Sequence, residues 1–88
     1  MNINHFAYFV EAVRENSITK AAESLFISQS TISKAIKCLE QAYNTELIDR
    51  KARNFKPTSA GEIFYNSAVK IVSNYQSETT VLATLLHS

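Results

Sequence analysis

The feature that most constrains this chain is the stretch over residues 18–39, which has the pattern of two short helices joined by a tight turn. Its first part has alanines and a leucine at helical spacing behind Thr19, a residue that can cap a helix. Phe26 and Ile27 end this apolar stripe, and we expect both to pack in the turn beneath the two helices. Ser28 offers a second N-cap directly afterwards. The pattern predicts a helix-turn-helix unit over residues 18–37.

The second helix of this unit is predicted to have two dissimilar sides. Ile32, Ile36 and Leu39 are spaced by four and three residues, which places them on one core-facing side. The opposite side has hydroxyl groups and cations and no acid. A short helix, a turn and a helix with such an outer face are what a helix-turn-helix presents to the major groove of DNA. Taken alone, the same face also suits a solvated helix surface.

The segments around this unit predict a small domain with a wing. Asn2 or Asn4 can cap a first helix, which the Asn16–Ser17 pair interrupts. The helix that follows Ser28 should end near residues 42–44. Residues 46–57 are predicted to form a two-stranded wing with a basic tip, because Pro57 forces the residue before it into an extended conformation.

Residues 59–88 are predicted to form one long amphipathic helix, capped by Thr58 or Ser59. Its apolar residues recur at steps of four and three, which suits the pairing of two long helices. A helix of about 40 Å on a small domain cannot bury this stripe by itself, so we expect a homodimer; folding back on its own domain is the alternative. The expected dimer-interface residues are Phe64, Ala68, Ile71, Tyr75, Leu82 and Leu85.

The charge of the chain is unevenly distributed, although its net value is only +1. Residues 28–57 contain six cations and three acids, whereas residues 1–27 contain two cations and three acids. The positive balance therefore coincides with the proposed second helix and wing, where it can attract phosphate groups.

Composition argues against several other classes of protein. The one glycine cannot build a phosphate-cradling loop, and the single Cys38 rules out a disulfide framework and a cysteine zinc site. We therefore expect no enzyme, no catalytic residues, no metal and no cofactor in this chain. The sequence has neither an apolar run of membrane-spanning length nor a signal-peptide pattern, so we expect a cytoplasmic protein without a membrane partner.

The run from Ser17 to Glu40 resembles the signature of LysR-type transcriptional regulators, and the likeness continues through Arg50, Arg53 and the Pro57–Gly61 stretch. The resemblance implies a mainly α fold: a winged helix-turn-helix domain over residues 1–58, with three helices and a two-stranded wing, and a linker or dimerisation helix over residues 59–88. It also implies a sequence-specific regulator that binds an interrupted dyad of double-stranded DNA as a dimer. The second helix would enter the major groove, and the wing would touch flanking backbone or the minor groove.

Full-length members of this family continue into an effector-binding domain, which is absent from this sequence. A small-molecule effector, and a tetramer, are therefore expected only in a longer protein, and an end just past the linker helix favours a fragment. The chain departs from the family pattern at three positions. Ser30 stands where many relatives have proline, Asn44 where they usually have glycine, and Ile48 where they often have phenylalanine.

Residue chemistry and the resemblance together predict two groups of DNA contacts. Glutamine can pair with adenine, and lysine can reach guanine or phosphate. The alternative to phosphate contact is plain helix capping for the residues that cap helices. For the wing arginines, the alternative to DNA contact is a hairpin exposed to solvent. The expected base or groove contacts are Gln29, Ser30, Thr31, Ser33, Lys34 and Lys37, and the expected phosphate and wing contacts are Ser17, Thr19, Lys20, Arg50 and Arg53. The near-neutral net charge keeps one other function open, a winged-helix protein-interaction module that does not bind DNA.

Overall fold

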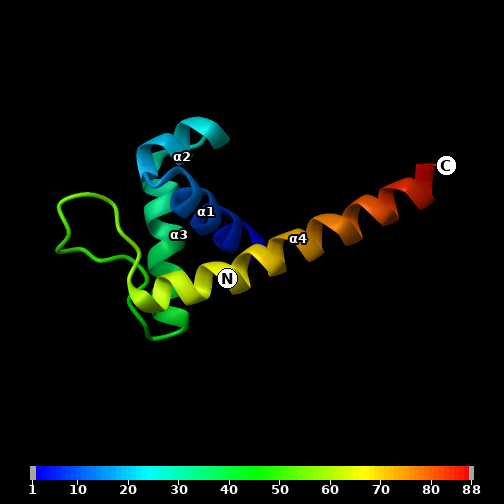
Figure 1. Ribbon diagram of the computed structural model, residues 1–88. Coiled ribbons are helices and arrows are strands. Elements are labelled where there is room, and N and C mark those ends of the chain that lie inside the picture. Colours follow the sequence, from blue (N-terminus) through cyan, green and yellow to red (C-terminus); the bar gives the residue numbers. More distant parts are fainter. Residues whose placement is uncertain (1, 88) are drawn as a thin grey trace.

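The computed structural model describes residues 2–87 of the 88-residue chain, with side chains over residues 2–76 and at Leu85. Four helices follow one another: α1 (Ile3–Glu15), α2 (Ile18–Leu25), α3 (Gln29–Ala42) and α4 (Ser59–His87). The first three pack together against the beginning of α4, and the rest of α4 extends away from them (Figure 1). The molecule is accordingly elongated, with extents of 51 × 25 × 19 Å.

Local capping chemistry sets where the first three helices begin. The Asn2 side chain accepts a hydrogen bond from the Asn4 N–H, and the Ser17 hydroxyl accepts one from the Lys20 N–H at 3.0 Å. Ser28 caps α3 in the same way. Ser17 therefore caps α2, whereas Thr19 lies inside the helix with its side chain exposed.

A single apolar core joins α1, α2, α3 and the start of α4. Helix α1 lies at its centre and contacts each of the other three helices. Phe64 of α4 reaches into this core. Its ring is stacked on that of Phe6, with 5.8 Å between the ring centroids, and it forms T-shaped pairs with the rings of Phe9 and Tyr43. The largest fully buried side chains are Phe9, Ile32, Ile36, Leu39 and Leu47.

The turn between α2 and α3 corrects one expectation. Ile27 packs against the core as expected, but Phe26 does not lie beneath the helices: it is 94% exposed. The cause is the backbone, because Phe26 ends α2 in the left-handed conformation with φ 57°. This conformation lets the Ile27 N–H donate a hydrogen bond to the Ala22 carbonyl, and it brings Ile27, not Phe26, to the core.

The wing differs from the two strands expected for it. In the part of the chain that the structure describes, the hairpin contains one isolated antiparallel bridge, between Ile48 and Pro57, and no strand. Ile48 and Pro57 form a pair whose own N–H and C=O groups do not bond to each other. The pairing consists of hydrogen bonds from the Asp49 N–H to the Lys56 carbonyl and from the Thr58 N–H to the Leu47 carbonyl. Residues 50–54 then form the bend at the tip.

Helix α4 is continuous over 29 residues, and its first turns belong to the domain core. Phe64 is half-buried against that core and Ala68 is fully buried, so the structure places these two expected interface residues inside the protomer. Ile71, Tyr75 and Leu85 are exposed farther along the helix, and the Leu82 side chain lies outside the described residues. No helix within residues 2–87 combines the length and the apolar character that crossing a membrane requires.

Candidate nucleic-acid interface

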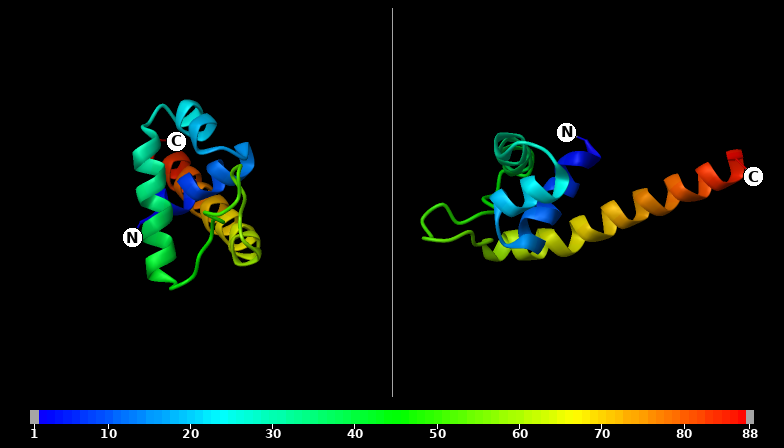
Figure 2. Two further views of the ribbon diagram at one scale, coloured as in Figure 1. Left: turned by 90° about the vertical axis from the view of Figure 1, so that its left-hand side faces the viewer. Right: turned by 90° about the horizontal axis from the view of Figure 1, so that it is seen from above.

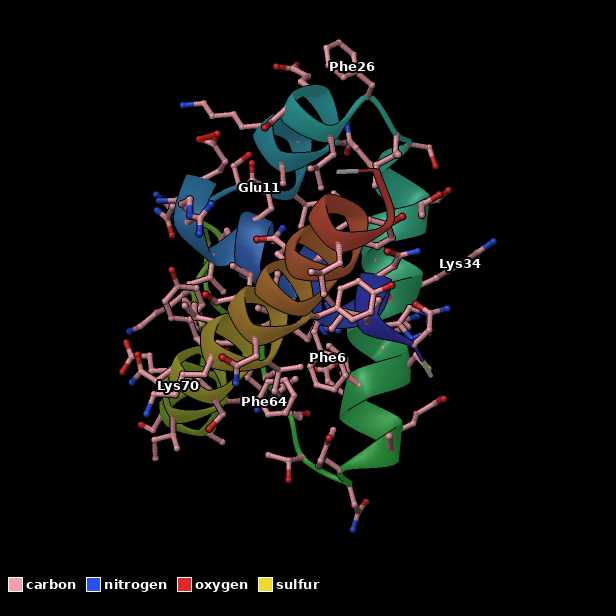
Figure 3. The ribbon with its side chains drawn as sticks, turned by 90° about the vertical axis from the view of Figure 1, so that its right-hand side faces the viewer. Phe6, Glu11, Phe26, Lys34, Phe64 and Lys70 are labelled. Atoms are coloured by element: carbon pink, nitrogen blue, oxygen red, sulfur yellow. The ribbon has the colours of Figure 1, made fainter. Side chains whose placement is uncertain are left out.

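Helix α3 presents its polar side to solvent because its apolar side is fixed in the core. Ile32, Ala35 and Ile36 are buried, and these positions hold the helix in one rotation about its axis. The expected contact residues lie on the remaining surface: Gln29, Ser30, Thr31, Lys34 and Lys37 are exposed, and Ser33 is half-buried. Lys34 extends away from the body of the molecule, on the other side from Lys70 of α4 (Figure 3).

The first turn of α3 is rich in hydroxyl groups. The Ser28 Oγ lies 3.2 Å from the Ser30 Oγ and 2.8 Å from the Thr31 Oγ1, and it also caps the helix through the Thr31 N–H. Ser30 therefore closes a small hydroxyl cluster at the position where many LysR-type relatives have proline. These short side chains leave the helix end accessible to a base edge or a phosphate.

The phosphate-side candidates from α2 and the wing face a common groove of about 580 Å³. Ser17 and Thr19 line it from the start of α2, and Arg50 and Arg53 line it from the wing. Figure 2 (left) shows α3, the wing loop and α2 along one face of the molecule. The fold thus brings expected residues of α2 and of the wing to one groove, and Lys20 is exposed on α2.

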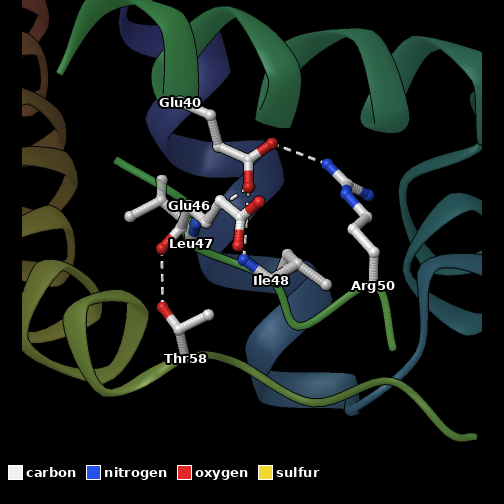
Figure 4. Close-up of polar contacts among 6 residues, drawn as sticks. All are labelled: Glu40, Glu46, Leu47, Ile48, Arg50 and Thr58. Carbon is white, nitrogen blue, oxygen red and sulfur yellow. Dashed lines mark hydrogen bonds and ion pairs between the residues drawn. The ribbon is translucent and has the colours of Figure 1, made fainter. Parts of the chain in front are cut away.

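Arg50 makes a contact within the chain that the sequence did not predict. Its Nη2 lies 2.6 Å from Oε1 of Glu40, near the end of α3 (Figure 4). The other Glu40 oxygen accepts from the backbone N–H groups of Leu47 and Ile48. A lone glutamate ten residues before an arginine is too weak a signal to find such a contact from the sequence.

These features define a class of protein. A helix-turn-helix whose second helix exposes an acid-free polar surface, with a basic loop beside it, is the arrangement of a helix-turn-helix regulator. The family model for bacterial regulatory helix-turn-helix proteins of the lysR family matches residues 3–62, and the chain belongs to this family.

Curated relatives of the chain are transcription regulators. The chain is 42% identical over 74 residues to the HTH-type transcriptional regulator BenM of Acinetobacter baylyi, and 42% identical over 73 residues to the regulator BudR of Klebsiella aerogenes. These matches cover 84% and 83% of this chain, but 24% of BenM and 51% of BudR. The chain thus spans between about a quarter and about half of the length of these relatives.

Solved structures agree with the observed fold. The BenM DNA-binding domain in complex with catB site 1 DNA has a TM-score of 0.90 at 35% identity, with 100% of this chain and 99% of that chain covered. Full-length BenM gives a TM-score of 0.82 at 39% identity, with 91% of this chain and 26% of that chain covered. The protein-interaction alternative is not favoured by these relatives, and none of those named here is an enzyme.

Proposed function

We propose that this chain is the DNA-reading part of a LysR-type transcription regulator, which binds double-stranded DNA sequence-specifically. The observation that carries the proposal is the exposed polar surface of α3, which bears two lysines and no acid and is held outward by four buried apolar side chains. In this reading α3 enters the major groove, and the wing lies on the flanking backbone or in the minor groove.

The residue roles follow from side-chain chemistry and exposure. Gln29 stands at the first position of α3, where its amide can pair with an adenine edge, and Lys34 can reach guanine one turn farther on. Thr31, Ser33 and Lys37 lie along the same helix and complete the groove contacts together with Ser30. Residues at the start of α2 and at the tip of the wing contact the phosphates of the DNA backbone. The residues proposed for phosphate contact are Ser17, Thr19, Lys20 and Arg53.

We also propose that α4 joins two copies of the chain, so that two α3 helices meet an interrupted dyad. The support is the exposed apolar surface that α4 retains after its first turns have packed on α1. Ile71, Tyr75 and Leu85 contribute to it, and Leu82 follows the same spacing in the sequence. Such a dimer would work in the cytoplasm, and a small-molecule effector or a tetramer would need residues outside this chain.

Selection from a random pool of DNA duplexes, at low and at moderate salt, tests the proposal. We expect enrichment of a two-fold-related site with an unconserved centre. Lys34→Ala and Gln29→Ala should each weaken binding to that site by about 1–3 kcal/mol where a base contact is lost. Lys70→Ala is the matched control, because Lys70 is an exposed lysine on α4, on the other side from Lys34 (Figure 3).

Two results would contradict the proposal. Unchanged binding by both α3 variants means that α3 does not read the site. No duplex binding at either salt concentration, together with a protein partner that stays bound at high salt, supports a protein-interaction module instead.

A further inference from the structure

Glu40 connects α3 to the wing with both of its carboxylate oxygens (Figure 4). Oε2 accepts hydrogen bonds from the backbone N–H groups of Leu47 and Ile48, at 2.8 and 3.3 Å. Oε1 lies 2.6 Å from the Arg50 guanidinium. One carboxylate therefore takes three donors from the segment that leads into the wing, and its side chain is only 13% exposed.

The Ile48 N–H has no partner within the hairpin because of the way the wing is paired. The bridge uses the Leu47 carbonyl and the Asp49 N–H, so the Ile48 N–H points away from the returning segment. Leu47 and Ile48 are both buried, where an unpaired N–H is costly. The carboxylate takes the place that a third strand would have in a larger sheet.

Besides the Glu40 contacts, few hydrogen bonds fix the direction of the wing, although Leu47, Ile48 and Phe55 pack against the core and the Thr58 hydroxyl donates to the Glu46 carbonyl. Within the described residues, its pairing consists of one bridge and two backbone hydrogen bonds, and its tip at residues 51–54 is mostly exposed. The Glu40 contacts lie at the base of this hairpin. A change there would therefore move the whole basic tip relative to α3.

We propose that Glu40 is a positioning residue for DNA binding: it holds the wing at a fixed orientation to α3, and Arg50 is its partner in this task. This inference rests on the proposed DNA-binding function. It moves Arg50 from the phosphate contacts expected for it to the positioning contact, and it leaves Arg53 as the wing arginine that reaches DNA. Arg53 is exposed, and no hydrogen bond or ion pair of its side chain is found among the described residues.

The experiment compares duplex binding at several salt concentrations for the wild-type chain and a set of variants. Each phosphate contact that is lost reduces the dependence of log K on log salt by about one. Arg53→Met should reduce this slope. Arg50→Met and Glu40→Gln should weaken binding by about two- to fivefold without changing the slope. Because they break the same contact, the double variant should bind no more weakly than either single variant.

Glu40→Ala tests the backbone part of the contact, and Glu40→Gln is its conservative counterpart. The glutamine carbonyl can still accept from Leu47 and Ile48, whereas alanine cannot. We expect Glu40→Ala to weaken binding by about tenfold and to speed hydrogen exchange at these two amides, and Glu40→Gln to restore most of that protection. Far-UV circular dichroism shows that each variant is folded under the binding conditions.

The possible outcomes separate this inference from the proposed function. If Arg50→Met lowers the salt slope as Arg53→Met does, and adds fully to Glu40→Gln, then Arg50 contacts phosphate and the inference is wrong. Wild-type affinity in Glu40→Ala also contradicts it. If the wild-type chain binds no duplex, the proposed function fails, and the exchange rates at Leu47 and Ile48 alone decide whether Glu40 holds the wing.

Discussion

Gly61 is the chain's single glycine, and its surroundings leave no room for a side chain. It lies in the first turn of α4, where a Cβ would come 2.1 Å from the Leu47 backbone oxygen. Gly61→Ala should therefore destabilise the fold by about 1–3 kcal/mol through overpacking, although alanine is the better helix former by about 1 kcal/mol. Urea unfolding measures the difference.

The control for this prediction is Ser67→Ala, on the same helix and exposed. That change should leave the free energy of unfolding within about 0.5 kcal/mol of wild type. A Gly61→Ala variant that is as stable as wild type would show that the wing base can move away from α4 at little cost.

Phe26 is a non-glycine residue with positive φ and an almost fully exposed side chain. The left-handed conformation costs a bulky residue about 1 kcal/mol, and asparagine adopts it more readily. Phe26→Asn should therefore raise the free energy of unfolding by up to about 1 kcal/mol. Thermal and urea unfolding provide the measurement.

Asn44→Phe is the reciprocal control for Phe26, because Asn44 has φ 50° at the end of α3. It should be destabilising by a similar amount. If Phe26→Asn instead lowers stability, the ring of Phe26 contributes contacts that the backbone argument neglects.

Sequence reasoning at the residue scale was best where chemistry acts locally. Ser28 as a cap and the end of the second helix near residues 42–44 follow from short-range rules, and the structure confirms both. The exposed Phe26 and the Glu40–Arg50 pair could not be predicted in this way. They depend on how a turn bends and on which helix the wing meets, and neither is encoded in neighbouring residues.

At the scale of elements, Thr58 links the wing to α4. Its hydroxyl accepts a hydrogen bond from the Gly61 N–H at 2.9 Å and donates one to the Glu46 carbonyl at 2.7 Å (Figure 4). Thr58→Ala removes both bonds and the N-cap of α4, so we expect a loss of about 1–2 kcal/mol of stability. Urea unfolding with Thr58→Ser as the control measures it, since serine keeps the hydroxyl. Equal losses in both variants would assign the effect to the methyl group.

The element pattern was predictable for the helices and less so for the wing. Apolar residues at steps of three and four mark the four helices, because their spacing records which side is buried. The wing has no comparable period. Two strands were expected over residues 46–57, but the chain bends at residues 50–54 and the wing is paired through one bridge.

For the molecule as a whole, the apolar stripe of α4 serves two purposes. The sequence shows one continuous seam and cannot show where the domain stops covering it. In the structure Phe64 and Ala68 close the core of the protomer, whereas Ile71 and Tyr75 lie beyond it and are 40% and 51% exposed. The proposed dimer would therefore depend on the part of α4 from Ile71 onward.

Tyr75→Asp tests this division of the helix, because it places a charge in the proposed interface without touching the buried core. Loss of an aromatic anchor at an interface costs about 2 kcal/mol or more, which corresponds to a roughly thirtyfold weaker dimer. Sedimentation equilibrium should show this shift. Ser73→Asp, exposed on the opposite side of α4 by helical count, should dimerise as wild type does.

The Tyr75→Asp variant should also show that dimerisation and DNA binding by α3 are separate properties. Tyr75→Asp should bind a single half-site as wild type does, because α3 is unchanged, but should lose the added affinity for the two-fold site that comes from linking two readers. Fluorescence anisotropy with half-site and full-site duplexes measures both. If Tyr75→Asp remains a dimer and keeps the full-site affinity, the two copies meet through another surface, and the exposed stripe of α4 has a different role.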